Sequence, residues 1–176
     1  MDSSKQKNEI KKESTGLYPE QLIEKAFKFH LQGNFTEAIK YYQYFIDRGF
    51  KDHRVFSNYG VLLQKHGKLK QAEISARKAV NLNPNYAKGH YNLGNILKDI
   101  GKLEDAELYT RRAIEIDPNY AKAYYNLGII LIDIGKLREA EKPTRQAITL
   151  KNDFADAYNN LGIILKDIGK LEDAEL

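Results

Sequence analysis

The chain contains no cysteine, and this absence excludes several kinds of site at once. Without thiols there is no disulfide framework, no thiolate metal site and no cysteine nucleophile. Packing alone must therefore hold the fold together.

Long apolar runs are absent as well. No stretch approaches the ~18 consecutive apolar residues of a membrane-spanning helix, and the N-terminus lacks the short apolar core of a secretory signal. The formal net charge is only +4, from 28 basic and 24 acidic residues, unlike the concentrated basic patch of a nucleic-acid-binding protein. We therefore expect a cytoplasmic protein with neither a membrane nor a nucleic acid as its partner.

The N-terminal segment, residues 1–18, has too few apolar side chains to build a core. It holds one isoleucine and one leucine among many lysines, serines, glutamates and asparagines. Burial of so little apolar surface cannot offset the entropy of ordering the segment. The composition predicts a flexible tail over residues 1–18 and a folded domain over residues 19–176.

A short pattern of glycine, a polar residue and an apolar residue recurs through that domain. Each glycine of the pattern comes 34 residues after the last, at Gly33, Gly67, Gly101, Gly135 and Gly169. A fixed period of this size indicates stacked supersecondary units. With the glycine at position 15 of each repeat, the repeats occupy residues 19–52, 53–86, 87–120, 121–154 and, truncated, 155–176.

Each repeat carries two stripes of apolar residues with a helical period. In the third repeat the first stripe includes Leu93 and Leu97, and the second begins at Leu103, as expected for two amphipathic helices. The glycine can end the first helix in the left-handed conformation. A turn such as Asp117-Pro118-Asn119 ends the second. Each repeat is therefore predicted to be a pair of helices.

The identities at eight positions of the repeat resemble those of the tetratricopeptide repeat family. In the third repeat these residues are His90, Leu93, Gly94, Leu97, Ala106, Thr110, Ala113 and Pro118. The resemblance implies an all-α fold, a right-handed superhelical solenoid of antiparallel helix pairs. Small residues such as Gly94 should lie where two helix backbones approach closely. Pro143, inside a predicted second helix, should remove one backbone hydrogen bond and bend that helix.

Several fragments imitate catalytic or metal-binding motifs without their context. Ser75 and Lys78 have the spacing of a serine–lysine catalytic pair, but they lie on a predicted repeat helix with no companion motifs. No two of the four histidines have the i, i+4 spacing that presents two metal ligands from one helix. We expect no catalytic residue, no metal site and no cofactor.

In the family that the sequence resembles, the first helices line a concave groove, and repeat positions 2, 5, 6, 9, 12 and 13 face it. Position 6 is asparagine in four of the five repeats, at a site expected to be exposed. An asparagine amide can donate and accept, which suits it to gripping the backbone of an extended peptide, and a similar ladder occurs in protein O-GlcNAc transferases. Alternatively, duplication copied one harmless asparagine. The predicted groove residues are Asn58, Asn92, Asn126, Asn160, Tyr91, Tyr125, Asn95, Ile129, Lys88, Lys122 and Lys98.

The resemblance implies a noncatalytic protein–protein interaction scaffold that holds an extended peptide or a partner helix in its groove. The alternative is the N-terminal, substrate-recruiting arm of a larger glycosyl-, sulfo- or methyltransferase truncated at residue 176, because NLGIILKDIGKLEDAEL resembles repeat arrays that precede such domains in bacterial proteins. A third candidate is self-association through the uncapped C-terminal end. There the last helix should fray, with Leu161, Leu165 and Ile168 facing water.

Overall fold

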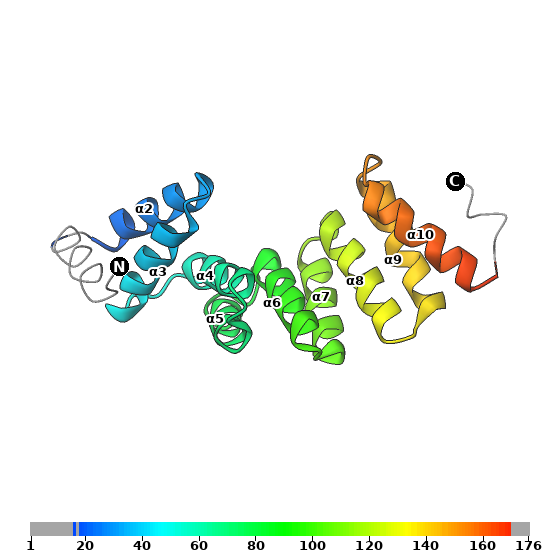
Figure 1. Ribbon diagram of the computed structural model, residues 1–176, viewed down its shortest axis with the longest axis horizontal. Helices are drawn as coiled ribbons and strands as arrows, with labels where there is room; N and C mark the ends of the chain where they lie inside the picture. Colours follow the sequence, from blue (N-terminus) through cyan, green and yellow to red (C-terminus); the bar gives the residue numbers. More distant parts are fainter. Residues whose placement is uncertain (1–15, 17, 170–176) are drawn as a thin grey trace. The chain divides into compact units, whose positions relative to one another are not determined.

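A computed structural model describes Gly16 and residues 18–169, and every regular element in that range is a helix. Five helices begin at the predicted starts of the repeats, which confirms both the 34-residue period and the all-α fold. The helices are α2 (Pro19–Leu31), α3 (Phe35–Asp47), α4 (His53–Lys65), α5 (Leu69–Leu82), α6 (Ala87–Ile100), α7 (Leu103–Ile116), α8 (Ala121–Asp133), α9 (Leu137–Leu150) and α10 (Ala155–Asp167) (Figure 1).

The chain divides into two compact bodies, Met1–Leu82 and Asn83–Leu176. The N-terminal body holds the hairpins α2–α3 and α4–α5, and the C-terminal body holds α6–α7, α8–α9 and α10. Apart from Gly16 and Tyr18, the predicted tail lies outside the described residues. Residues 170–176, expected to begin the second helix of the fifth repeat, also lie outside them.

The recurring glycines end the first helices as the sequence predicts. Their φ angles are 74° at Gly33, 72° at Gly67, 84° at Gly101, 85° at Gly135 and 83° at Gly169. Residues other than glycine rarely adopt this left-handed backbone conformation, because their Cβ atom would approach the following carbonyl oxygen. Glycine therefore lets the chain reverse direction between the two helices of each repeat.

A second set of glycines permits close packing inside the hairpins. A Cβ atom added to Gly94 on α6 would lie 2.4 Å from Oγ1 of Thr110 on α7, and one added to Gly128 on α8 would lie 2.4 Å from Oγ1 of Thr144 on α9. Ala106 is fully buried in the same hairpin as Gly94. The predicted close approach of helix backbones at the small residues is therefore confirmed.

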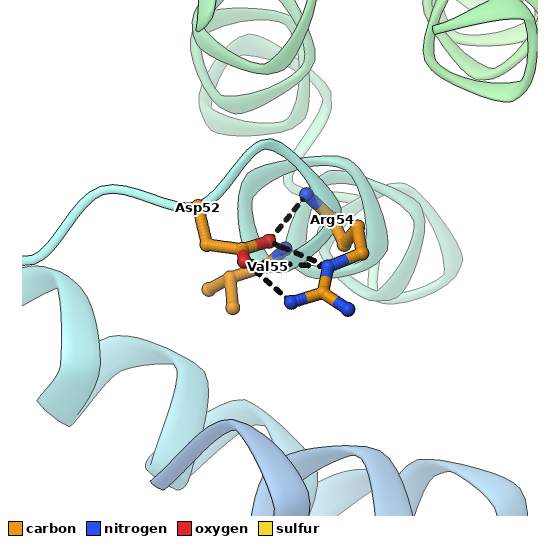
Figure 2. Close-up of polar contacts among 3 residues, drawn as sticks. All are labelled: Asp52, Arg54 and Val55. Atoms are coloured by element: carbon orange, nitrogen blue, oxygen red, sulfur yellow. Dashed lines mark hydrogen bonds and ion pairs between the residues drawn. The ribbon is translucent and has the colours of Figure 1, made fainter. Parts of the chain in front are cut away.

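Helix α4 begins with a side-chain cap that the first helices of the next three repeats, α6, α8 and α10, lack. Oδ1 of Asp52 accepts hydrogen bonds from the backbone N–H groups of Arg54 at 2.8 Å and Val55 at 3.3 Å. The Arg54 guanidinium also pairs with this carboxylate, with Nη2 2.7 Å from Oδ2 (Figure 2). Partial burial raises the pKa of Asp52, but the hydrogen bonds from Arg54 and Val55 outweigh it and leave the pKa below its usual value.

The sequence predicts two local effects of Pro143, the loss of one backbone hydrogen bond and a bend in the helix. Helix α9 runs as one helix from Leu137 to Leu150 with Pro143 inside it, and the Pro143 ring is buried. Proline has no N–H to donate, so one hydrogen bond of this helix is missing as predicted. The bend stays a prediction.

The expectation that the apolar side chains of α10 would face water is wrong. Leu161 is 5% exposed and Leu165 is fully buried, while Ile168 is partly buried. The physical reason is that α10 packs against both α9 and α8, and its Ile164 joins a buried cluster with Leu127, Leu131 and Ala140. The preceding hairpin therefore provides much of the cover that was expected only from a following second helix.

Candidate partner-binding surface

The first helices of the C-terminal body lie side by side. Helix α8 contacts α6 and α10, so equivalent repeat positions fall on neighbouring helices. We call the side chains at positions 2, 5, 6, 9 and 12 of these three helices the first-helix surface. Its predicted members are Lys88, Tyr91, Asn92, Asn95 and Lys98 on α6, Lys122, Tyr125, Asn126 and Ile129 on α8, and Asn160 on α10. Asn58, the remaining predicted residue, lies on α4 in the N-terminal body.

Two members of the asparagine column are buried, contrary to the expectation of an exposed site. Asn92 is 6% exposed and Asn126 is 4% exposed, whereas Asn58 and Asn160 are partly exposed. Asn126 is covered because α8 packs against α7, the second helix of the preceding repeat. Exposure therefore differs within the column, although its residue type does not.

The described hydrogen bonds show what covers these amides. Nδ2 of Asn126 donates to Oγ1 of Thr110, at position 24 of the preceding repeat, over 3.4 Å. In the N-terminal body Asn58 hydrogen-bonds Tyr42, which also occupies position 24 of its preceding repeat. Burial raises the pKa of Tyr42, and this bond partly offsets the increase. Positions 6 and 24 thus meet across the junction between two repeats in both bodies.

The tyrosines at position 5 pack against aromatic rings that precede the next first helix. The ring centroids of Tyr91 and Tyr120 are 5.0 Å apart, and those of Tyr125 and Phe154 are 4.7 Å apart. Sequence reasoning missed Tyr120 and Phe154. The available signal was an aromatic residue at position 34 of three consecutive repeats, beginning with Tyr86.

Tyr125 on α8 also interacts with residues of α10. Burial raises the pKa of the Tyr125 hydroxyl, as does the nearby negative charge of Asp156, whereas a hydrogen bond with Asn160 lowers it. Asp156 and Asn160 both lie on α10. Tyr125 and Asn160 are therefore partly engaged with each other on the first-helix surface.

Charged and apolar side chains occupy the more open parts of this surface. Lys88 and Lys122 are exposed, and neither has an ion-pair partner among the described residues. Nζ of Lys98 lies 3.8 Å from Oδ1 of Asp99. At position 9, Ile129 is partly buried, and Ile163 on α10 is 51% exposed. The arrangement can pair with carboxylates and bury apolar side chains, two properties of peptide-binding surfaces.

Comparison with known families agrees with this repeat geometry. Three profiles described as tetratricopeptide repeat match residues 53–86, 87–120 and 109–142. Together they span residues 53–142, just over half of the 176-residue chain. The chain is a tetratricopeptide repeat protein. A comparison with curated protein sequences finds no match.

Solved structures share the tetratricopeptide fold over most of the chain. A crystal structure of MamA has a TM-score of 0.77 and 26% identity, and the match covers 85% of this chain and 87% of that one. MamA from Desulfovibrio magneticus has a TM-score of 0.79 and 20% identity, covering 89% of each chain. A tetratricopeptide repeat protein from Parabacteroides merdae has a TM-score of 0.74 and 21% identity, covering 89% of this chain and 62% of that one. These matches confirm the predicted helical repeat fold.

The family and fold support the coarse functional prediction, a protein–protein interaction scaffold of a kind that is typically noncatalytic. No helix among the described residues is both long and apolar enough to cross a membrane. Groups of three or more histidine, cysteine, aspartate or glutamate residues that could hold a metal ion do not occur in the described part of the chain.

The residues that imitated catalytic motifs have structural roles in the tetratricopeptide repeats. Ser75 is 6% exposed, and its hydroxyl donates to the backbone oxygen of Phe56 over 2.8 Å. This bond joins α5 to α4 within one hairpin. Nε2 of His90 lies 2.9 Å from the backbone oxygen of Pro84, and the His90 ring stacks on Tyr109. Both side chains therefore hold local structure.

Proposed function

We propose that the first-helix surface of the C-terminal body binds an extended peptide or a partner helix. The tetratricopeptide family supports this proposal because its members include interaction scaffolds, and the adjacency of α6, α8 and α10 supplies a continuous set of side chains. A ligand lying across these helices would meet one repeat after another. Binding energy could then accumulate from several weak contacts.

The observation that carries the proposal is the chemistry at the α8 and α10 end of the surface. Ile129 and Ile163 occupy position 9 of neighbouring helices, and Ile163 is 51% exposed. Exposed lysines flank them in the repeat, Lys122 at position 2 and Lys166 at position 12. A peptide with apolar side chains next to carboxylates would bury Ile163 and pair with these lysines.

A peptide selection with matched variants tests this binding site. Random-sequence peptides would be displayed and selected on the full chain, and the dissociation constant of the best binders would be measured by fluorescence anisotropy. Ile163→Asp and Lys122→Glu should each weaken binding by roughly tenfold, because a central contact contributes more than ~1 kcal/mol. Leu108→Asp is the control, since Leu108 is also an open apolar residue, 63% exposed, and lies on the second helix α7.

The control separates this surface from the rest of the chain. Leu108→Asp should change the dissociation constant by less than about twofold, and helix content measured by circular dichroism should be the same in all variants. Peptides that lose binding with Leu108→Asp and keep it with Ile163→Asp would contradict the proposal. That result would place the binding site on the second helices.

Two other predictions of the sequence have no support from contacts among the described residues. The transferase-arm alternative rests on the resemblance of the C-terminal repeat sequence, and reading the gene past Leu176 tests it. Self-association through the C-terminal end predicts a mass that rises with concentration in light scattering. A constant monomer mass would contradict it.

A further inference from the structure

We infer that Asn126 is a positioning residue whose hydrogen bond to Thr110 sets how α8 sits against the preceding hairpin, and so sets the spacing of the first-helix surface. The inference concerns the junction between the third and fourth repeats. It holds whichever ligand the surface binds, and its test needs no ligand.

Three helices meet at the hydroxyl group of Thr110. Thr110 lies on α7, and its Oγ1 occupies the space that a Cβ at Gly94 on α6 would need, only 2.4 Å away. Nδ2 of Asn126 on α8 donates to the same oxygen over 3.4 Å. The absence of a Cβ at Gly94 therefore leaves room for the Thr110 side chain between α6 and α7. Asn126 of the next repeat hydrogen-bonds the Thr110 hydroxyl at that place.

Burial makes this bond consequential. Thr110 is fully buried and Asn126 is 4% exposed, so water has little access to replace the bond if α8 moves. A buried amide that loses its partner keeps the cost of desolvation. Rotating or sliding α8 along α7 is therefore opposed by a directional interaction in addition to apolar packing, which resists sliding less specifically.

The same pair of positions is joined in the N-terminal body by a different chemical group. There Asn58 on α4 bonds the hydroxyl of Tyr42 on α3. Tyrosine and threonine share little beyond a hydroxyl group, so the recurrence points to the bond between position 6 and position 24. It gives Asn58 and Asn126 a structural role that requires no ligand.

The fourth repeat provides a matched control. Oγ1 of Thr144, at position 24, donates to the backbone oxygen of Ala140 within α9 over 2.8 Å, and the side chain of Asn160 on α10 hydrogen-bonds Tyr125. Thr144 also lies over a glycine, Gly128, as Thr110 lies over Gly94. Replacing Thr144 thus removes a buried hydroxyl in an equivalent setting without touching the bond of Asn126.

A distance measurement tests the positioning role directly. The chain has no cysteine, so spin labels can be placed at Lys88→Cys on α6 and Lys122→Cys on α8, both exposed sites at position 2. Asn126→Leu and Thr110→Val should each shift or broaden the distance distribution by on the order of 2 Å, the scale of helix shifts at interfaces. Thr110→Ser keeps the hydroxyl and should restore the original distribution, and Thr144→Val should leave it unchanged.

A double-mutant cycle gives an independent readout. Opening constants of the α8 amides, measured by native-state hydrogen exchange, should rise roughly fivefold for Asn126→Leu and for Thr110→Val. The two substitutions together should also give about fivefold, because they remove the same bond. Asn126→Leu combined with Thr144→Val should give the product of the single effects.

Each result decides the inference. Coupled exchange effects together with a changed label distance support it. An unchanged distance in Asn126→Leu with intact helix content would overturn it, and so would multiplicative effects of Asn126→Leu and Thr110→Val. If Asn126→Leu fails to fold, the comparison of Thr110→Val, which keeps the side-chain volume, with Thr110→Ser, which keeps the hydroxyl, decides in its place.

Discussion

Replacing Asp52 with alanine should loosen the start of α4. The Asp52 carboxylate accepts hydrogen bonds from the backbone of Arg54 and Val55 and pairs with the Arg54 guanidinium (Figure 2). Residues in the equivalent place before α6, α8 and α10 make no side-chain cap bond. The start of α4 therefore has a carboxylate cap that the starts of α6, α8 and α10 lack.

The expected loss follows from the two kinds of contact. Removing an N-cap side chain costs about 1 kcal/mol. The ion pair adds only ~0.5 kcal/mol, because the Arg54 side chain is 50% exposed and solvent screens it. Asp52→Ala should thus destabilise α4 by about 1.5 kcal/mol at neutral pH, roughly a tenfold increase in the opening constant. Asp52→Asn keeps a capping oxygen and should show only about a twofold increase.

Native-state hydrogen exchange is the assay, because the amides of Arg54 and Val55 are the donors in question. Faster exchange should concentrate in the first turn of α4 in Asp52→Ala. Asp153→Ala is the control, because Asp153 is 78% exposed and lies 3.8 Å from Lys151; it should change stability by less than about 0.5 kcal/mol. Equal exchange in Asp52→Ala and the wild-type chain would refute the capping argument.

The pH dependence has a definite sign. The pKa of Asp52 is lower in the folded chain than its ordinary value, which is about 3.9. The charge-dependent stabilisation is therefore fully present above pH ~4 and is lost as pH falls through the folded pKa. The difference between wild type and Asp52→Asn should shrink at acid pH. A difference that grows on acidification would contradict this sign.

Two further predictions concern the C-terminal body. Gly94→Ala should destabilise it by about 1–3 kcal/mol in urea unfolding, because the new Cβ would meet Thr110 and lie 3.3 Å from the backbone oxygen of Ala106. At the same repeat position Gly162 has no described atom within 4 Å, so Gly162→Ala should be neutral or stabilising, and an equal loss in both variants would count against the close-packing argument. Glu107 bonds Arg111 within α7 and Lys136 across the repeat junction. Partial burial raises its pKa, but these bonds outweigh it and lower the pKa below the usual value. Its stabilisation is thus lost as pH falls below about 4, and Glu107→Gln should flatten this part of the stability profile measured by acid titration of circular dichroism; an unchanged profile would exclude the junction bond as its source.

Repeat periodicity predicts most of the fold because the information is local. Five first helices begin at Pro19, His53, Ala87, Ala121 and Ala155, the positions that follow from one spacing of glycines. The glycines themselves are required by a backbone angle. A 34-residue unit that repeats its helix and turn signals leaves little choice of architecture.

The candidate site was less predictable, since side-chain exposure depends on residues from another repeat. The asparagine column and its flanking lysines follow from the sequence, but the burial of Asn92 and Asn126 does not. Likewise, the packing of α10 onto α8 and α9 buries Leu165, where the sequence suggested an exposed end. An incomplete repeat in the sequence does not show how much of its apolar surface the neighbouring repeat buries.

The sequence by itself determined the repeat period, the helix starts, the reversing glycines and the side chains offered on each first helix, because each of these follows from residue type and spacing along the chain. Only the tertiary structure decided which of those side chains remain open. Asn126 is hydrogen-bonded to Thr110, which lies 16 residues earlier on a different hairpin. Tyr125 packs against Phe154, which precedes the next first helix. Exposure at this surface depends on how one repeat docks against the next, through contacts that no single repeat contains.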